Sequence, residues 1–426
     1  MKLSDPKLPK RSEFPKDFYW GVSVASHQVE GGNHNQWTRW EHKTAARLAA
    51  TAEDRLGNLP IWNEIKNQAE DAHNYVSGSG VGHYSKYLLD FKLAKTLNLN
   101  AFRSSIEWSR INPQEGVFDA KEIEHYSEYF RAMKAEGLEP FVTLFHWSVP
   151  QWFADKGGFA KRSNLRYWRD FVHVLAQNMD LSGIKYVLTI NEANTFSGMG
   201  YAVGEFPPGE KKYLKSLVVY RNLALAHRIA YKIVKNKFPN IQVGSANQFQ
   251  KAIGKGIGGK ISTWFELQYS NWGWVKASKY YDFIGFNYYF TDYRNKLLSV
   301  LADSNPTEPI NDIGFYMEPS GIDWVLKETS KRYKNIPILI TENGVADMHD
   351  QYREWWLVET IQAMSRALKS GVPLIGYLHW SLLDNFEWQY GWWPKFGLIS
   401  VDRKTMKRRV KPSAKAWAKW LGATQQ

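Results

Sequence analysis

The chain has 426 residues, of which 44% are hydrophobic and 23% are charged; this is typical of a globular protein and excludes a disordered chain. Cysteine is absent, which excludes disulfide bonds, thiol nucleophiles and cysteine-based metal sites. The 55 Lys and Arg outnumber the 42 Asp and Glu, so the formal net charge is +13. Such a charge bears on solubility and nonspecific attraction, not on fold.

The N-terminal segment shows no targeting signal. Residues 1–16 are polar and lack the apolar core of a secretory signal. No run in the chain approaches the roughly 18 apolar residues of a membrane helix. We therefore expect a cytoplasmic protein without a membrane partner.

Short apolar runs follow helical patterns that end at glycine. Residues 123–133 are apolar at helical spacing, Gly137 follows, and residues 141–144 form an apolar run. Glycine commonly ends helices, and uninterrupted apolar runs are typical of strands buried on both faces of a parallel sheet. Eight such runs predict strands at 20–24, 101–105, 141–144, 186–190, 241–245, 283–286, 338–341 and 374–378.

Eight strands alternating with helices predict an α/β fold, a single (β/α)8 barrel domain over residues 1–426. Periodicity alone does not separate this barrel from a doubly wound open sheet. Residues 23–26, after the first run, do not form a glycine-rich phosphate loop. We expect residues 43–81 to be rich in loops, with one short helix.

Polar side chains follow most of the runs, and in a barrel such residues converge on one mouth. In chain order they include Gln28, Arg103, His146, Asn191, Glu192, Asn287, Tyr289, Glu342, Trp380, Glu387 and Trp388. Two carboxylates beside amides and indoles suit cleavage of a glycosidic bond, because one protonates the leaving oxygen and the other attacks the anomeric carbon or activates water. We find no Ser–His–Asp pattern and no metal-ligand spacing, and we expect neither a metal nor another cofactor.

The motifs TINEA at 189–193 and ITENG at 340–344 resemble those of glycoside hydrolase family 1, the retaining β-glycosidases. The resemblance covers nearly the whole chain and is specific because its motifs occur together and in order. The further segments that carry it are 18–22, 28–31, 102–111, 144–147, 282–289 and 377–388.

The resemblance implies that Glu192 is the general acid/base and Glu342 the nucleophile. It further implies support of the nucleophile by Arg103, Asn287 and Tyr289. The implied ligands of the non-reducing sugar are Gln28, His146, Asn191 and Glu387, with Trp380 as the stacking platform and Trp388 beside it.

Some positions depart from the family pattern. Ala193 stands where a proline usually follows the acid/base glutamate, and Ser148 follows the His146–Trp147 pair where the family often has an acidic residue. Phe315 takes the place of a tryptophan that often cradles the leaving group. These departures leave the leaving-group preference open.

Electrostatics predicts different protonation states for the two glutamates. Glu342 beside Arg103 should stay ionised, and Glu192, desolvated and close to that anion, should have a raised pKa. Retention of configuration further requires the two carboxyl groups to lie about 5–5.5 Å apart.

Glu387 indicates an unphosphorylated substrate, because a carboxylate about 4 Å from a phosphate is repelled by roughly 4 kcal/mol per charge pair at an effective dielectric constant near 20. We predict hydrolysis of β-D-glucosides, with β-galactosides or β-fucosides as side activities. The alternatives are a transglycosylase, a thioglycoside-cleaving relative, a 6-phospho-β-glycosidase and a non-catalytic sugar-binding barrel. Glu192 speaks against the thioglycoside branch, which typically lacks the acid/base.

The basic run at 403–411 could suggest nucleic acid, but no nucleic-acid motif accompanies it. We expect a solvated turn there and a small-molecule or oligosaccharide β-glycoside as the only partner. The sequence does not indicate the oligomeric state.

Overall fold

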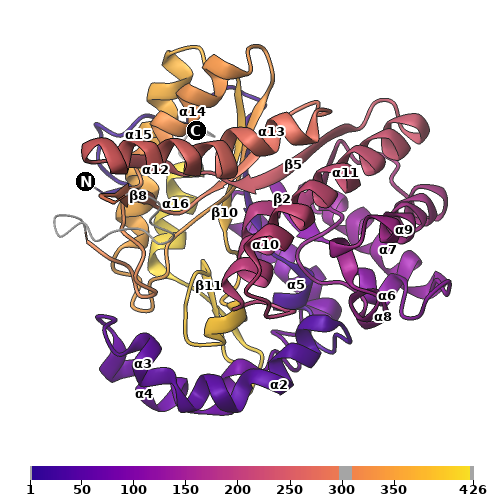
Figure 1. Ribbon diagram of the computed structural model, residues 1–426. Helices are drawn as coiled ribbons and strands as arrows, with labels where there is room; N and C mark the ends of the chain where they lie inside the picture. The colour runs from indigo at the N-terminus through magenta and orange to yellow at the C-terminus, as the bar shows by residue number, and fades with distance from the viewer. Residues whose placement is uncertain (1, 297–308, 423–426) are drawn as a thin grey trace.

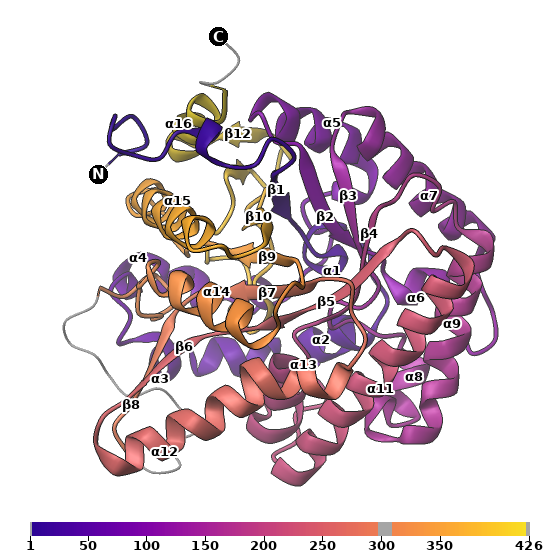
Figure 2. The same cartoon turned by 90° about the horizontal axis from the view of Figure 1, so that it is seen from above.

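The computed structural model describes residues 2–296 and 309–422. Eight parallel strands close into a barrel in the order β1-β10-β9-β7-β5-β4-β3-β2, surrounded by helices in Figure 2. The strands are β1 (Tyr19–Ser23), β2 (Ala101–Ser105), β3 (Glu139–Thr143), β4 (Tyr186–Asn191), β5 (Gln242–Gln248), β7 (Ile284–Tyr288), β9 (Ile338–Asn343) and β10 (Leu374–Trp380). The closed order confirms the predicted barrel and excludes the open sheet.

The inside of the barrel is filled by a compact apolar cluster. The cluster takes members from different barrel strands, among them Ala101, Phe141, Leu188, Ala246, Leu339 and Leu378. Phe141 stacks on Tyr186, with ring centroids 4.5 Å apart. Because this layer closes the barrel interior, a ligand can be held only beyond the strand ends.

The outer helices pack apolar stripes against the barrel. In α7 (Ala120–Ala135), Ile123, Tyr126, Phe130 and Met133 are buried, and the Asp119 side chain caps the first turn by accepting from two backbone amides. The other long outer helices are α5 (His83–Thr96), α9 (Leu165–Asn178), α11 (Tyr213–Lys237), α14 (Gly321–Arg332), α15 (Arg353–Lys369) and α16 (Pro412–Gly422).

The segment after β1 differs from its prediction. Instead of a loop-rich stretch with one short helix, it contains α2 (Gln36–Ala50), α3 (Ala52–Leu56), α4 (Trp62–Ala69) and a 3-10 turn at Ala72–Tyr75. Asn35 caps α2 by accepting from the Thr38 amide. These helices lie together along one end of the molecule (Figure 1). Sequence periodicity missed them because α3 and α4 are short and all three helices are only partly buried.

Short elements complete the fold. They are α1 (Ser26–Val29), α6 (Trp108–Ile111), α8 (Gln151–Asp155), α10 (Ala193–Ser197), β6 (Lys251–Gly254), α12 (Gly256–Leu267), α13 (Gly273–Ser278), β8 (Thr291–Arg294), β11 (Ile399–Val401) and β12 (Arg408–Val410). β11 and β12 pair antiparallel, and Asp402 accepts from the amides of Lys404 and Thr405 in the exposed turn between them. The predicted solvated turn therefore covers only the first part of the basic run, because β12 follows the turn and two of the run's cations are buried in ion pairs, Arg408 with Asp90 and Lys411 with Asp384. Within the described ranges, no helix combines the length and apolarity needed to cross a bilayer.

Candidate active site

Two glutamates meet at the carboxyl ends of the barrel strands. Glu192 directly follows β4, and Glu342 is the second-last residue of β9. Between these strands in the barrel, β7 carries Asn287, which donates a hydrogen bond to Glu192 and also lowers the pKa of Glu342. Each glutamate is almost fully buried, at 4% and 3% exposure.

Glu342 is held by a cation and a phenol. Its Oε1 accepts from Arg103 at 2.5 Å, and its Oε2 accepts from the Tyr289 hydroxyl at 2.7 Å. Arg103 is fully buried and also donates to Thr143 and to the Thr341 carbonyl. Burial raises the pKa of Glu342, and the Arg103 charge is the largest effect that opposes the rise. The ionised form of Glu342 is thus stabilised more strongly by its neighbours than the ionised form of Glu192.

Glu192 lacks such a cation partner. Its Oε1 accepts from Asn287 Nδ2 at 2.6 Å. Burial, followed by the charge of Glu342, raises the pKa of Glu192 to about 8. The backbone of Glu192 has φ of +44°, a conformation that costs free energy in a non-glycine residue and is often found at functional sites. Because its pKa is raised to about 8, Glu192 holds a proton at neutral pH.

Asn191 connects this pair to His146. Its Oδ1 accepts from Arg103 at 2.7 Å and from Asn287 at 3.2 Å, and its Nδ2 lies 3.2 Å from His146 Nε2. Burial lowers the pKa of His146 well below its usual value, so the ring is neutral. With Nε2 accepting from Asn191, the ring proton lies on Nδ1.

A third carboxylate closes the other side of the site. Gln28 Nε2 donates to Glu387 Oε2 at 3.3 Å, and both Gln28 and Trp380 lower the pKa of Glu387. Burial, followed by the charges of Glu342 and Glu192, raises the pKa of Glu387 to about 8. The three glutamates are thus coupled, because the charge of Glu342 raises the pKa of the other two.

Two polar atoms of the site are buried without a partner among the described residues: Gln28 Oε1 and His146 Nδ1. Buried polar atoms in proteins usually have a partner. One of these atoms accepts and the other donates, so a ligand hydroxyl can satisfy either one.

Aromatic rings flank these groups. Trp380 stacks on His146 at 5.9 Å between centroids, and Trp388 stacks on His27 at 5.5 Å. Phe315 contacts Phe290 at 4.8 Å and packs against the cluster that contains Trp380. Every residue that the sequence singled out for the site therefore has a place around this mouth.

The structure adds an aromatic wall to which the sequence assigned no role: Trp37, Trp147 and Phe206. Trp147 and Trp37 both contact Trp388, at 4.8 and 4.6 Å, and Phe206 contacts both tryptophans. Trp147 Nε1 donates to the Asn191 carbonyl at 3.1 Å. The place of Trp147 just after a predicted strand could have revealed it, whereas Trp37 and Phe206 follow no strand.

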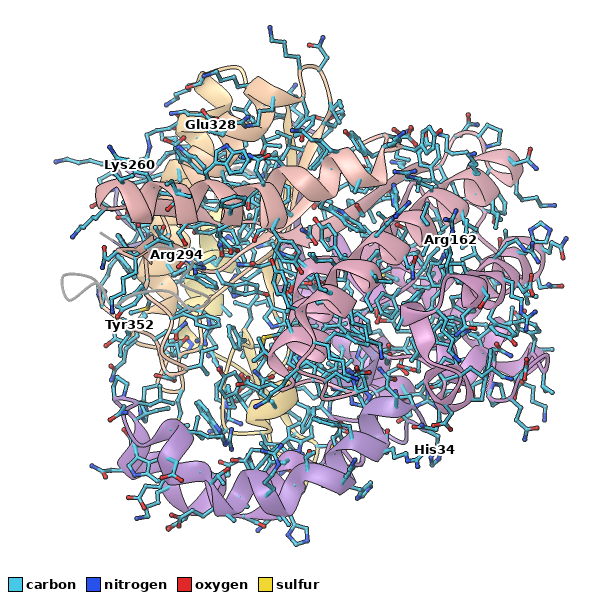
Figure 3. The ribbon with its side chains drawn as sticks, viewed as in Figure 1. His34, Arg162, Lys260, Arg294, Glu328 and Tyr352 are labelled. Carbon is cyan, nitrogen blue, oxygen red and sulfur yellow. The ribbon has the colours of Figure 1, made fainter. Side chains whose placement is uncertain are left out.

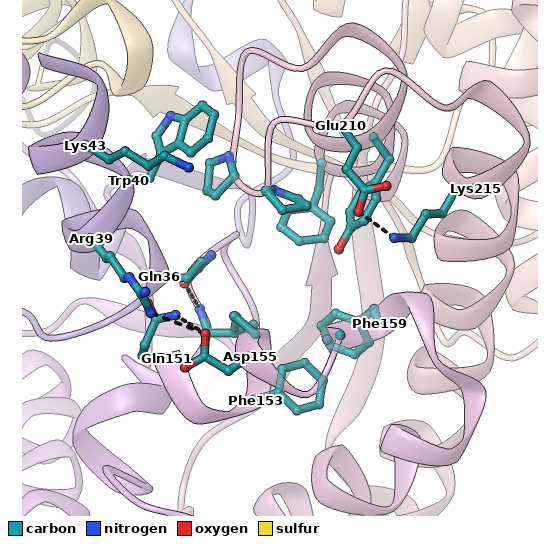
Figure 4. A pocket seen from close by; sticks show the side chains of 18 residues that line it. Gln36, Arg39, Trp40, Lys43, Gln151, Phe153, Asp155, Phe159, Glu210 and Lys215 are labelled. Carbon is teal, nitrogen blue, oxygen red and sulfur yellow. Dashed lines mark hydrogen bonds and ion pairs between the residues drawn. The ribbon is translucent and has the colours of Figure 1, made fainter.

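A cavity of about 410 Å³ lies outside this wall, between α2, α8 and the segment around Pro207–Pro208 (Figure 4). Four of its five charged side chains are paired, Arg39 with Asp155 and Lys215 with Glu210, whereas Lys43 has no ion-pair partner among the described residues. Neither Glu192 nor Glu342 is among its lining residues, so it is separate from the carboxylate pair. Among the residues the structure describes, no cluster of His, Asp and Glu could hold a metal ion.

Comparison with known proteins agrees with this geometry. The sequence model of Glycosyl hydrolase family 1 matches residues 10–256 and 266–425. The chain is 28% identical over 451 residues to β-glucosidase A of Thermotoga maritima, covering 94% of this chain and 96% of that protein.

Solved structures of the same kind superimpose closely. β-Glucosidase from T. maritima in complex with castanospermine gives a TM-score of 0.84 at 26% identity, covering 95% of this chain and 97% of that one. A β-glycosidase from Pyrococcus horikoshii gives 0.84 at 29% identity, covering 99% and 95%. With a family match over most of its length and the expected barrel, the chain belongs to glycosyl hydrolase family 1 and is a glycosidase.

Proposed function

We propose that the protein, acting as one catalytic domain over residues 1–426, is a retaining β-glycosidase that removes terminal non-reducing β-D-glucosyl residues, with β-galactosyl or β-fucosyl groups as side substrates. The observation that carries the proposal is the unequal environment of two buried glutamates that share Asn287. Glu342 has a cation partner at 2.5 Å, whereas burial and the neighbouring charge raise the pKa of Glu192 to about 8.

In the first step, Glu342 attacks the anomeric carbon while Glu192 gives its proton to the leaving oxygen. The glycosidic bond breaks, an ester forms between Glu342 and the sugar, and the alcohol departs. Tyr289 and Arg103 hold both carboxylate oxygens of Glu342 and so aim the nucleophile.

In the second step, Glu192 is ionised and accepts a proton from water, which attacks the anomeric carbon and releases Glu342. Its pKa falls while Glu342 is esterified, because the negative charge that opposed its ionisation is gone. The same group can therefore act first as an acid and then as a base.

The sugar is held by the groups that surround the pair. Glu387, Gln28, Asn191 and His146 would bind its hydroxyls, with two unpartnered atoms, Gln28 Oε1 and His146 Nδ1, available for this purpose. Trp380 would stack on the apolar face of the ring, with Trp388 beside it. Phe315, half-buried at the rim, would contact the leaving group.

Two other functions share this site. A transglycosylase would transfer the sugar to an alcohol instead of water, and a 6-phospho-β-glycosidase would need a phosphate beside Glu387. The charge of Glu342, joined by that of Glu387 once this group ionises, disfavours a phosphate by Coulomb repulsion.

A panel of 4-nitrophenyl β-D-glycosides tests the proposal. We expect turnover of the glucoside, slower turnover of the 6-phosphoglucoside, and a first-formed β-anomer when the product is followed by proton NMR. A first-formed α-anomer would exclude retention, and faster cleavage of the phosphorylated substrate would overturn the role given to Glu387. Adding methanol distinguishes transfer from hydrolysis by the yield of methyl glucoside.

A further inference from the structure

The exposed large apolar side chains gather on two helices. Of the thirteen that are strongly exposed among the described residues, eight belong to α11 and α12. We call these eight the apolar face: Tyr213, Leu214, Leu217, Val218, Ile257, Ile261, Trp264 and Phe265. Large clustered apolar patches on a protein surface usually mark a binding surface, whereas scattered ones do not.

Helix α12 buries its small residues and exposes its large apolar residues, the opposite of a helix that packs against a core. Its buried residues are the small Gly259 and Ser262, and a Cβ on Gly259 would lie 2.2 Å from the Arg294 carbonyl oxygen. Its large residues Ile257 and Trp264 are 81% and 57% exposed. Since positions 257, 261, 264 and 265 share one side of a helix, α12 holds its apolar side away from the barrel.

The C-terminal end of α12 lies beside α11. Tyr269, which follows α12 by two residues, stacks on Tyr220 of α11 at 4.9 Å and accepts a hydrogen bond from the Tyr220 hydroxyl through its carbonyl at 2.7 Å. Figures 1 and 2 both show α11 and α12 on the outside of the molecule.

The surroundings of the apolar face are basic. Residues 211–221 and 255–267 contain six Lys or Arg and a single acid, Glu266, which pairs with Arg294. Figure 3 shows Lys260 extending outward from α12. Four of the cations have no ion-pair partner in the part of the chain that the structure describes: Lys211, Arg221, Lys255 and Lys260.

We propose that the apolar face docks the enzyme onto an anionic lipid bilayer. Its tryptophan, phenylalanine and aliphatic side chains would enter the boundary between headgroups and acyl chains, while the lysines contact anionic headgroups; surface-bound amphipathic helices combine these features. A second copy of the chain fits less well, because it would bring another net charge of +13 to a face that is already basic. The sequence predicted no membrane partner because no segment is long and apolar enough to span a bilayer. Binding to the bilayer surface does not require such a segment.

Vesicle cosedimentation of the full chain tests the proposal. We expect binding to phosphatidylcholine vesicles containing about 30% phosphatidylglycerol, weaker binding to pure phosphatidylcholine, and loss of binding in high salt. Trp264→Ser with Phe265→Ser should lower the partition coefficient roughly tenfold or more. Leu88→Ser with Leu89→Ser, which changes two exposed apolar residues on α5, is the matched control and should bind like the wild type.

A second readout uses the absence of native cysteine. An environment-sensitive fluorophore on Ile261→Cys should shift to the blue on anionic vesicles, and the same label on Leu88→Cys should not. Both serine variants should keep wild-type activity on a soluble aryl glucoside, which shows that they fold. The proposal is overturned by failure to bind anionic vesicles, by unchanged binding of the α12 variant, or by a dimer in sedimentation velocity that the α12 variant abolishes.

Discussion

Asn287 donates from Nδ2 to Glu192 Oε1 at 2.6 Å, although the two residues are 95 positions apart in the chain. Its Oδ1 accepts from the Thr341 hydroxyl at 2.6 Å, which fixes the direction of the amide. Because Asn287 also lowers the pKa of Glu342, one amide acts on both carboxylates. It favours the ionised form of each and limits the rise in their pKa values.

Replacing Asn287 by Ala should shift the alkaline limb of the pH profile. The Asn287 hydrogen bond lowers the pKa of Glu192, which lies at about 8 with this bond in place. Without it, the general acid keeps its proton to higher pH, so the alkaline limb of kcat/KM moves upward while kcat falls by about 10²-fold. Rate profiles of Asn287→Ala and of the exposed control Asn178→Ala check this, and an unmoved limb would contradict it.

Glu342→Gln should abolish turnover. An amide cannot attack the anomeric carbon, so we expect kcat to fall on the order of 10⁴-fold, with loss of covalent labelling by a 2-deoxy-2-fluoro-β-glucoside. Mass spectrometry of the labelled wild type should locate the sugar on the peptide that contains Glu342. A label on any other residue would refute the assignment. Glu124→Gln, at an exposed ion pair, is the control and should react normally.

Glu192→Ala should affect substrates according to their leaving groups. Poor leaving groups need the proton and should lose about 10²- to 10⁴-fold in rate, whereas 2,4-dinitrophenyl glucoside should lose little in its first step. Azide should restore turnover and give a β-glycosyl azide. The alkaline limb near pH 8, which follows from the raised pKa of Glu192, should disappear. Equal losses for all leaving groups would count against the acid/base role.

Glu387→Gln should stabilise the fold at alkaline pH. The pKa of Glu387 is about 8 in the folded state, above the ordinary value of 4.5. Between pH 4.5 and pH 8, Glu387 is therefore protonated in the folded protein and ionised in the unfolded chain. Wild-type stability therefore falls as pH rises through this window and levels off above it. Differential scanning fluorimetry should show little difference between variant and wild type at pH 4.5, and an advantage for the variant on the order of 1 to 3 kcal/mol above pH 8. A constant difference across pH would contradict the raised pKa.

The barrel strands could be predicted because they are buried on both faces, which leaves uninterrupted apolar runs such as 338–341. The helices between residues 36 and 69 could not, because their buried residues are few and depend on what they cover. The main site residues could be located by their positions after strands. Trp37 and Phe206 reach the same wall from segments without that signal.

The amino-acid sequence by itself determined the barrel and the family motifs, and with them the candidate site residues, since these follow from local patterns of apolar and polar side chains. Only the tertiary structure decided that Asn287, which was expected to support Glu342, donates its hydrogen bond to Glu192. It confirmed the expected pair of Arg103 and Glu342. It also decided that Ile257 and Trp264 face outward although their spacing would suit a core. The physical reason is that burial and electrostatic proximity depend on which distant segments are neighbours in space, and that is a property of the folded chain.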